Sequence, residues 1–146
     1  MNHELIFRLA NLAVVPGWAL LLFAPTWPWT QVVAGTLLPM GMSGLYAVLF
    51  VMHITGSNGD FGSLEAVQLL FQTPAVALAG WVHYLAFDLF LGAWIARDAR
   101  RLSLSQLAVA PCLLLTFVLG PLGLASYCCL RFARTRKWRL TEGESS

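Results

Sequence analysis

Residues 74–95, PAVALAGWVHYLAFDLFLGAWI, form an apolar run that contains a histidine and an aspartate. A helix that spans a membrane needs about 20 largely apolar residues, and this run is long enough. An aspartate near the centre of such a helix costs about 2.5–3.5 kcal/mol on insertion scales. The run therefore predicts a membrane-spanning helix in which Asp88 is protonated, paired with a cation or facing water.

The whole chain has the composition of a membrane protein. Of its 146 residues, 58% are hydrophobic and 11% are charged, whereas ordinary soluble domains have roughly 45–50% and 25%. Three further apolar stretches are long enough to span, at residues 5–23, 30–54 and 104–130. We expect residues 1–131 to form a single all-α domain, a polytopic membrane bundle of four transmembrane helices. Residues 132–146 are expected to form a basic and then disordered C-terminal tail.

A short amphipathic segment lies between the second and third spans, after the turn-forming sequence TGSNGDFGS. Ser63 is a suitable N-cap, Glu65 would stand in the first turn, and apolar residues follow at helical spacing. Residues 63–71 are too few to span, so they predict one short interfacial helix. Glu65 is expected either to cap this helix or to reach Arg8 or His53 and cover a polar pocket.

The distribution of basic residues bears on topology. Four crossings would place both termini on one side, together with Arg8 and the five basic residues between positions 131 and 139. Three arginines, at positions 97, 100 and 101, would lie on the opposite side. The positive-inside rule then favours cytoplasmic termini in a multi-pass protein of the cell membrane. Basic clusters beside apolar spans indicate contact with lipid headgroups and no nucleic-acid partner.

Helical phase separates the ionisable residues of the third span. At about 100° per residue, Trp81, Tyr84 and Asp88 fall within an arc of about 60°. His83 points about 140° away from Asp88, so the two are not a local pair. Because ionisable residues inside a membrane are candidates for function, we take His83 and Asp88 as the leading site residues.

Polar residues of the first two spans could join them. Asn11 and Trp18 are seven residues apart and share a face, with Arg8 nearby, and Tyr46 and His53 have the same spacing. These side chains could converge on one polar pocket with aromatic walls. The alternative is that each forms only an interhelical hydrogen bond, worth about 0.6 kcal/mol in membranes, and that His53 is a solvated interfacial residue.

Several chemistries are excluded by what the sequence lacks. Three histidines are too few for a membrane di-iron hydroxylase. His53 and His83 would differ in depth by roughly 10 Å, which suits bis-histidine haem ligation poorly. There is no G-x-G-x-x-G after a strand, no P-loop and no G-x-S-x-G. We therefore expect no metal and no other cofactor. Cys128 and Cys129 either carry palmitate or pack in the core.

Three stretches resemble a known family: FGSLEAVQLLF at 61–71, GWVHYLAFDLFLGAWI at 80–95 and GPLG at 120–123. Over roughly residues 53–125 the chain resembles the abscisic-acid-deficiency-type membrane proteins, described as neoxanthin-synthase-like. In plants that family is linked to the conversion of violaxanthin into neoxanthin, which opens a carotenoid epoxide to an allenic alcohol. The resemblance implies a carotenoid-related role, without fixing that substrate.

The implied reaction is redox-neutral and needs an acid and a base. A protonated Asp88 could donate to the epoxide oxygen, and His83 or His53 could accept a proton, while aromatic side chains line a slot for the polyene. One hypothesis is thus a cofactor-independent isomerase of a carotenoid or related isoprenoid. The alternative is a non-catalytic pigment- or lipid-binding subunit that assists another carotenoid-pathway membrane protein or forms a homo-oligomer. A small transporter has less support, because four helices with so few polar residues offer little for a pore.

Overall fold

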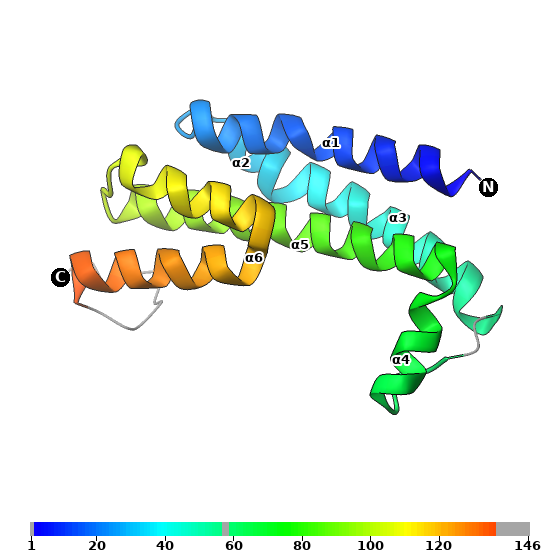
Figure 1. The fold of residues 1–146 in the computed structure, drawn as a ribbon. Helices are drawn as coiled ribbons and strands as arrows, with labels where there is room; N and C mark the ends of the chain where they lie inside the picture. Colours follow the sequence, from blue (N-terminus) through cyan, green and yellow to red (C-terminus); the bar gives the residue numbers. More distant parts are fainter. Residues whose placement is uncertain (1, 57–58, 137–146) are drawn as a thin grey trace.

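All regular secondary structure in residues 2–56 and 59–136, the part of the chain that this computed structural model describes, is helical (Figure 1). The elements are α1 (His3–Phe23), α2 (Thr30–Val32), the π-helical η1 (Val33–Leu37), α3 (Leu38–His53), the 3-10 turn η2 (Ile54–Gly56), α4 (Leu64–Phe71), α5 (Pro74–Arg101) and α6 (Gln106–Thr135). Four stretches are long and apolar enough to cross a membrane: His3–Phe23, Thr30–Gly56, Pro74–Arg101 and Gln106–Thr135. The all-α class and the four apolar helical stretches are therefore confirmed.

Local sequence explains where the helices begin. The side chain of Asn2 accepts a hydrogen bond from the Leu5 N–H at 3.1 Å and so caps α1. Ser63 accepts from the Ala66 N–H at 3.1 Å, which confirms the predicted N-cap of the short helix α4. Pro74 occupies the first turn of α5, where its missing N–H costs nothing.

The second apolar stretch changes its winding ahead of a proline. Pro39 has no N–H to donate to the carbonyl of Gly35, so a regular α-helical turn cannot close there. The chain widens into the π-helical turn Val33–Leu37 just before this point. Gly35 lies close to α5, because a Cβ at this position would be 3.3 Å from that of Ala93. The Gln31 side chain donates to the Ala93 carbonyl at 3.1 Å and ties the two helices together.

The core lies around α5, which contacts α1, α3 and α6. Leu85, Leu89 and Ile95 of α5 are buried in one continuous apolar cluster with residues of the other three helices. Gly92 permits close approach of α1, since a Cβ there would be 2.7 Å from the ring of Trp18. A glycine at this position therefore allows the two helices to pack closely.

The fourth apolar stretch is bent back on itself. Leu119 has non-helical backbone angles, φ −142° and ψ 57°, and Pro121 follows directly. Figure 1 shows the residues after this break (orange) running back beside the residues before it (yellow). Gly123 lies directly against Thr116, where a side chain would not fit. Each half has at most 16 residues, about 24 Å of helix, which is less than the ~30 Å apolar thickness of a bilayer.

The fold-back changes where the ends of the chain lie. Tyr127 and Arg131 of the returning half bond to Asp98 in the last turns of α5. In Figure 1 the N-terminal end of α1 and the C-terminal end of α6 lie at opposite ends of the bundle. Four full crossings would instead bring these two ends to the same end of the bundle, so the prediction that both termini share one side depends on whether α6 crosses the membrane. The predicted tail begins within α6, and residues 137–146 lie outside the described part.

Candidate functional site

One face of α5 carries a row of aromatic rings that continues onto α3. His83 and Phe87 stack with ring centroids 4.5 Å apart, and Tyr46 lies 5.4 Å from His83. Phe50 follows at 5.4 Å from Tyr46, and Phe61 at 6.2 Å from Phe50. We call these five residues the aromatic ladder. It forms an elongated, largely apolar track along the seam between α3 and α5.

The ladder leads into a groove of about 450 Å³ between α5 and the η1–α3 segment. Its lining residues are Gly35, Thr36, Pro39, Met40, Ser43, Ala86, Phe87 and Phe90. Phe87 and Phe90 remain 60% and 51% exposed, so the groove is open on its outer side. The Ser43 hydroxyl donates to the Pro39 carbonyl at 2.8 Å, which leaves the wall with little polar character. Such a groove suits a hydrophobic ligand.

The opposite face of α5 is polar and begins at Trp81. The indole N–H of Trp81 donates to Asn11 Oδ1 at 3.2 Å, and the Asn11 amide donates to the Phe7 carbonyl at 2.7 Å. The rings of Trp81 and Tyr84 lie 5.3 Å apart. Trp81 and Tyr84 therefore share a face, as helical phase predicts, and Asn11 serves as a hydrogen-bonding link between α1 and α5.

Tyr84 and Asp88 continue this face to the break in α6. The Tyr84 hydroxyl donates to the carbonyl of Val118 at 2.9 Å and reaches that of Phe117 at 3.3 Å. Asp88 is 8% exposed and packs directly on Gly120, within reach of its N–H and of the Tyr84 hydroxyl. Asp88 Oδ2 nevertheless makes no hydrogen bond of normal geometry within the described part of the chain. Tyr84 and Asp88 thus meet the backbone groups that the break leaves without helical partners.

The two leading candidates for acid and base do not share a site. His83 belongs to the aromatic ladder, between Tyr46 and Phe87, whereas Asp88 faces the break in α6. His53 lies elsewhere, with Nδ1 2.9 Å from the Leu49 carbonyl. A single small reacting group cannot contact all three side chains in this arrangement.

The other predicted ligand-binding residues also separate. Trp18 is 4% exposed and packs in the core, 5.3 Å from the ring of Phe117. Arg8 pairs with Glu4 at 2.7 Å on the exposed surface of α1. Glu65 is exposed in the first turn of α4, and the structure does not bring it to Arg8 or His53. The single polar pocket that the sequence suggested does not form. Tyr46 is part of the ladder, and Asn11 of the α1–α5 link.

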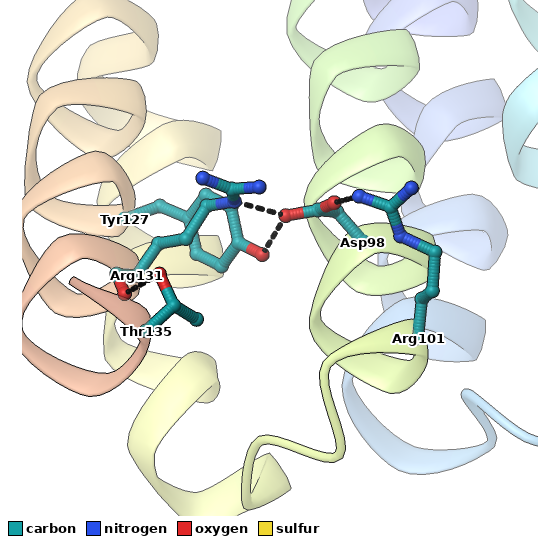
Figure 2. A network of polar contacts seen from close by, with 5 residues as sticks. All are labelled: Asp98, Arg101, Tyr127, Arg131 and Thr135. Atoms are coloured by element: carbon teal, nitrogen blue, oxygen red, sulfur yellow. Dashed lines mark hydrogen bonds and ion pairs between the residues drawn. The ribbon is translucent and has the colours of Figure 1, made fainter. Parts of the chain in front are cut away.

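A buried polar network at the C-terminal end of α5 was not foreseen from the sequence (Figure 2). Asp98 Oδ2 accepts from the Tyr127 hydroxyl at 2.6 Å and from Arg131 Nε at 2.9 Å, while Oδ1 accepts from Arg101 at 2.7 Å. Asp98 and Arg131 are 6% and 4% exposed. Four full crossings would place the arginines at 97, 100 and 101 on one side of the membrane and Arg131 on the other. The sequence signal for this network was the Gly120–Pro121 pair, which indicates a point where the last apolar helix can reverse its direction.

Among the described residues, no group of three or more His, Cys, Asp or Glu side chains lies close enough together to hold a metal ion. Cys112 is buried, Cys128 is half-buried and Cys129 is exposed, and all three are free thiols. The chemistry available to the two faces of α5 is therefore that of aromatic rings, hydroxyls, an imidazole and a carboxyl group.

Comparison with families of known proteins gives a match over most of the chain. The family described as ABA DEFICIENT 4-like matches residues 5–127. This range contains the aromatic ladder, the groove and the break in α6, and ends at Tyr127. The same comparisons find no match among curated proteins and none among solved structures.

Proposed function

The chain belongs to the ABA DEFICIENT 4-like family, and from that premise we propose that it binds a carotenoid-like or other isoprenoid polyene within the membrane. The ligand lies along the aromatic ladder and ends in the groove beside Phe87. Family membership points loosely to a carotenoid-related membrane protein. The polyene and its position are our inference from the side chains.

The observation that carries this proposal is the continuity of the ladder. The ladder has five rings, which come from the loop before α4, from α3 and from α5. The centroids of neighbouring rings lie 4.5–6.2 Å apart. Lipid tails are as apolar as leucine, so apolar surface alone does not select a ligand inside a bilayer. Flat aromatic faces add specific stacking and dispersion contacts to a conjugated chain. A rigid polyene matches this track better than a flexible acyl chain does.

The geometry supports binding more strongly than acid–base catalysis. An isomerase needs an acid and a base at the same reacting carbons, but Asp88 faces α6 and His83 faces the ladder. Of the ladder residues, His83 is the one whose ring carries nitrogen atoms that can accept a proton. The preferred function is therefore that of a pigment- or lipid-binding subunit that presents its ligand to another membrane protein. If the chain is a catalyst, His83 is the base, and the acid comes from a group outside the aromatic ladder.

The proposal is tested by replacing one ring at the groove. Purified protein is reconstituted with β-carotene, and retained pigment is measured by visible absorbance after gel filtration. Because Phe87 lies where the ladder meets the groove, Phe87→Ala is expected to lower affinity up to about tenfold, the equivalent of about 1.4 kcal/mol. Phe23→Ala is the matched control, since Phe23 is 85% exposed at the end of α1. Equal pigment retention by the two variants would contradict the proposal.

A second variant separates binding from catalysis. His83→Phe keeps an aromatic ring in the ladder and removes the imidazole nitrogens. We expect it to retain β-carotene as the wild type does. Membranes that contain the wild-type chain are also assayed for an isomerised carotenoid. If this product forms with the wild type and is lost with His83→Phe while pigment binding is unchanged, His83 acts as a base. The isomerase function then replaces the binding function.

A further inference from the structure

We propose that the break in α6 and the face of α5 opposite it form a binding site for a monovalent cation, with sodium as the fitting ion. The site is separate from the aromatic ladder and does not depend on the proposed polyene. Its residues are Tyr84, Asp88, Phe117, Val118 and Gly120.

The break places several oxygen atoms together inside the bundle. Pro121 has no N–H for the carbonyl of Phe117, and the non-helical Leu119 interrupts the bonding of Val118. Both carbonyl oxygens instead lie 2.9–3.3 Å from the Tyr84 hydroxyl. Asp88 lies beside the same hydroxyl. A carboxylate and two main-chain carbonyls therefore lie around the phenol oxygen of Tyr84.

The charge of this cluster is not balanced by the protein. Asp88 is 8% exposed, its Oδ2 has no hydrogen bond, and no ion pair to it occurs among the described residues. An unpaired carboxylate within an apolar bundle is costly, and such residues commonly pair or mark an ion pathway. A cation at Oδ2 would supply the missing partner.

The donor set fits a monovalent ion. All the atoms that would coordinate the ion are hard oxygens, which are the ligands of alkali and alkaline-earth cations. Calcium takes 6–8 oxygens, often from several carboxylates, whereas this cluster contains one carboxylate. Carbonyls of interrupted helices that coordinate sodium or protons are a known arrangement in membrane proteins. One negative charge and neutral oxygens match one positive charge.

Gly120 keeps the cluster compact. A Cβ at this position would overlap the Asp88 carboxylate, so no other residue permits this approach. Gly120 also begins the returning half of α6, and its N–H lies within reach of the carboxylate. Asp88 is thus fixed between the start of one half-helix and the exposed carbonyls of the other.

The test measures thermal unfolding of the full chain in uncharged detergent, in sodium chloride against choline chloride at equal concentration. Sodium is expected to raise the midpoint by roughly 3–5 °C at saturation, because it binds only the folded chain. Asp88→Asn should abolish this rise. Asp60→Asn is the matched control, since Asp60 is exposed and accepts a hydrogen bond from the Gly62 N–H of its own loop, and it should keep the rise.

A second variant covers the case in which Asp88→Asn does not fold. Tyr84→Phe removes one donor oxygen and keeps the ring, so the sodium concentration for half of the effect should increase about 3- to 10-fold. The proposal is overturned if choline stabilises as well as sodium does, if Asp88→Asn keeps the sodium effect, or if Tyr84→Phe leaves the half-effect concentration unchanged.

Discussion

Single residues of α5 show what helical phase can and cannot reveal. Phase alone placed Trp81, Tyr84 and Asp88 on one face and His83 on another, and the contacts of these side chains agree. Phase could not tell which helix lies opposite each face. Asp88 meets the break in α6 rather than a polar pocket, because tertiary packing decides its neighbour. The buried network of Asp98 has no local sequence signal, since its partners Tyr127 and Arg131 lie 29 and 33 residues away.

The Asp98 network makes a prediction at this scale. Asp98→Asn removes the negative charge that the buried Arg131 faces at 2.9 Å, and breaking a buried pair in this way costs about 3–5 kcal/mol. The unfolding midpoint in detergent should fall sharply. Glu4→Gln is the control, because the Glu4–Arg8 pair is exposed, with side chains 65% and 74% accessible, and is worth about 0–1 kcal/mol. Similar midpoints for the two variants would show that the buried network adds nothing.

At the scale of elements, composition and turn residues predicted most of the helices. The four apolar stretches and the Ser63-capped helix α4 follow from length, periodicity and capping, which are local properties. The break in α6 has only a weak signal in the local sequence. Pro111 and Pro121 both lie inside α6, yet the non-helical residue is Leu119, beside the second. The side chains that satisfy this break, Tyr84 and Asp88, come from another helix and leave no trace in the local sequence.

The tight contact at the break predicts a contrast between two glycines. Gly120→Ala would push a methyl group into the Asp88 carboxylate, and such overpacking typically costs about 1–3 kcal/mol. Gly44→Ala in α3 meets nothing within 4 Å and should gain up to about 1 kcal/mol from helix propensity. Thermal unfolding of both variants checks the direction of each change. A neutral Gly120→Ala would mean that the two half-helices do not close on Asp88 in the membrane.

The whole molecule differs from the sequence prediction because one apolar stretch folds back on itself. Apolar length alone cannot distinguish a 30-residue crossing from two shorter helices that enter and leave on one side. The returning half is held by Asp98, Tyr127 and Arg131, and its start by Asp88. These contacts connect residues that the linear order places across the membrane from one another. The re-entrant arrangement therefore depends on long-range polar pairs that sequence periodicity does not report.

This arrangement predicts an orientation. Most arginines of the described chain gather at the end of the bundle where α5 ends and α6 begins and returns, namely Arg97, Arg100, Arg101, Arg131 and Arg134. Arg8 lies in the first turns of α1, whose N-terminal end is at the other end of the bundle (Figure 1), and is paired with Glu4. By the positive-inside rule the arginine-rich end faces the cytoplasm, so the N-terminal end of α1 faces the opposite side.

Cysteine labelling decides this orientation. The variants His3→Cys and Thr135→Cys are each made in a chain whose three natural cysteines are replaced by alanine. A membrane-impermeant maleimide added to intact cells should label His3→Cys and leave Thr135→Cys unlabelled until the membrane is opened. The reverse pattern would contradict the orientation but keep the re-entrant hairpin, because the two ends would still lie on opposite sides. Labelling of both positions from the same side would overturn the hairpin itself, since only a full fourth crossing of α6 returns its C-terminal end to the side on which α1 begins.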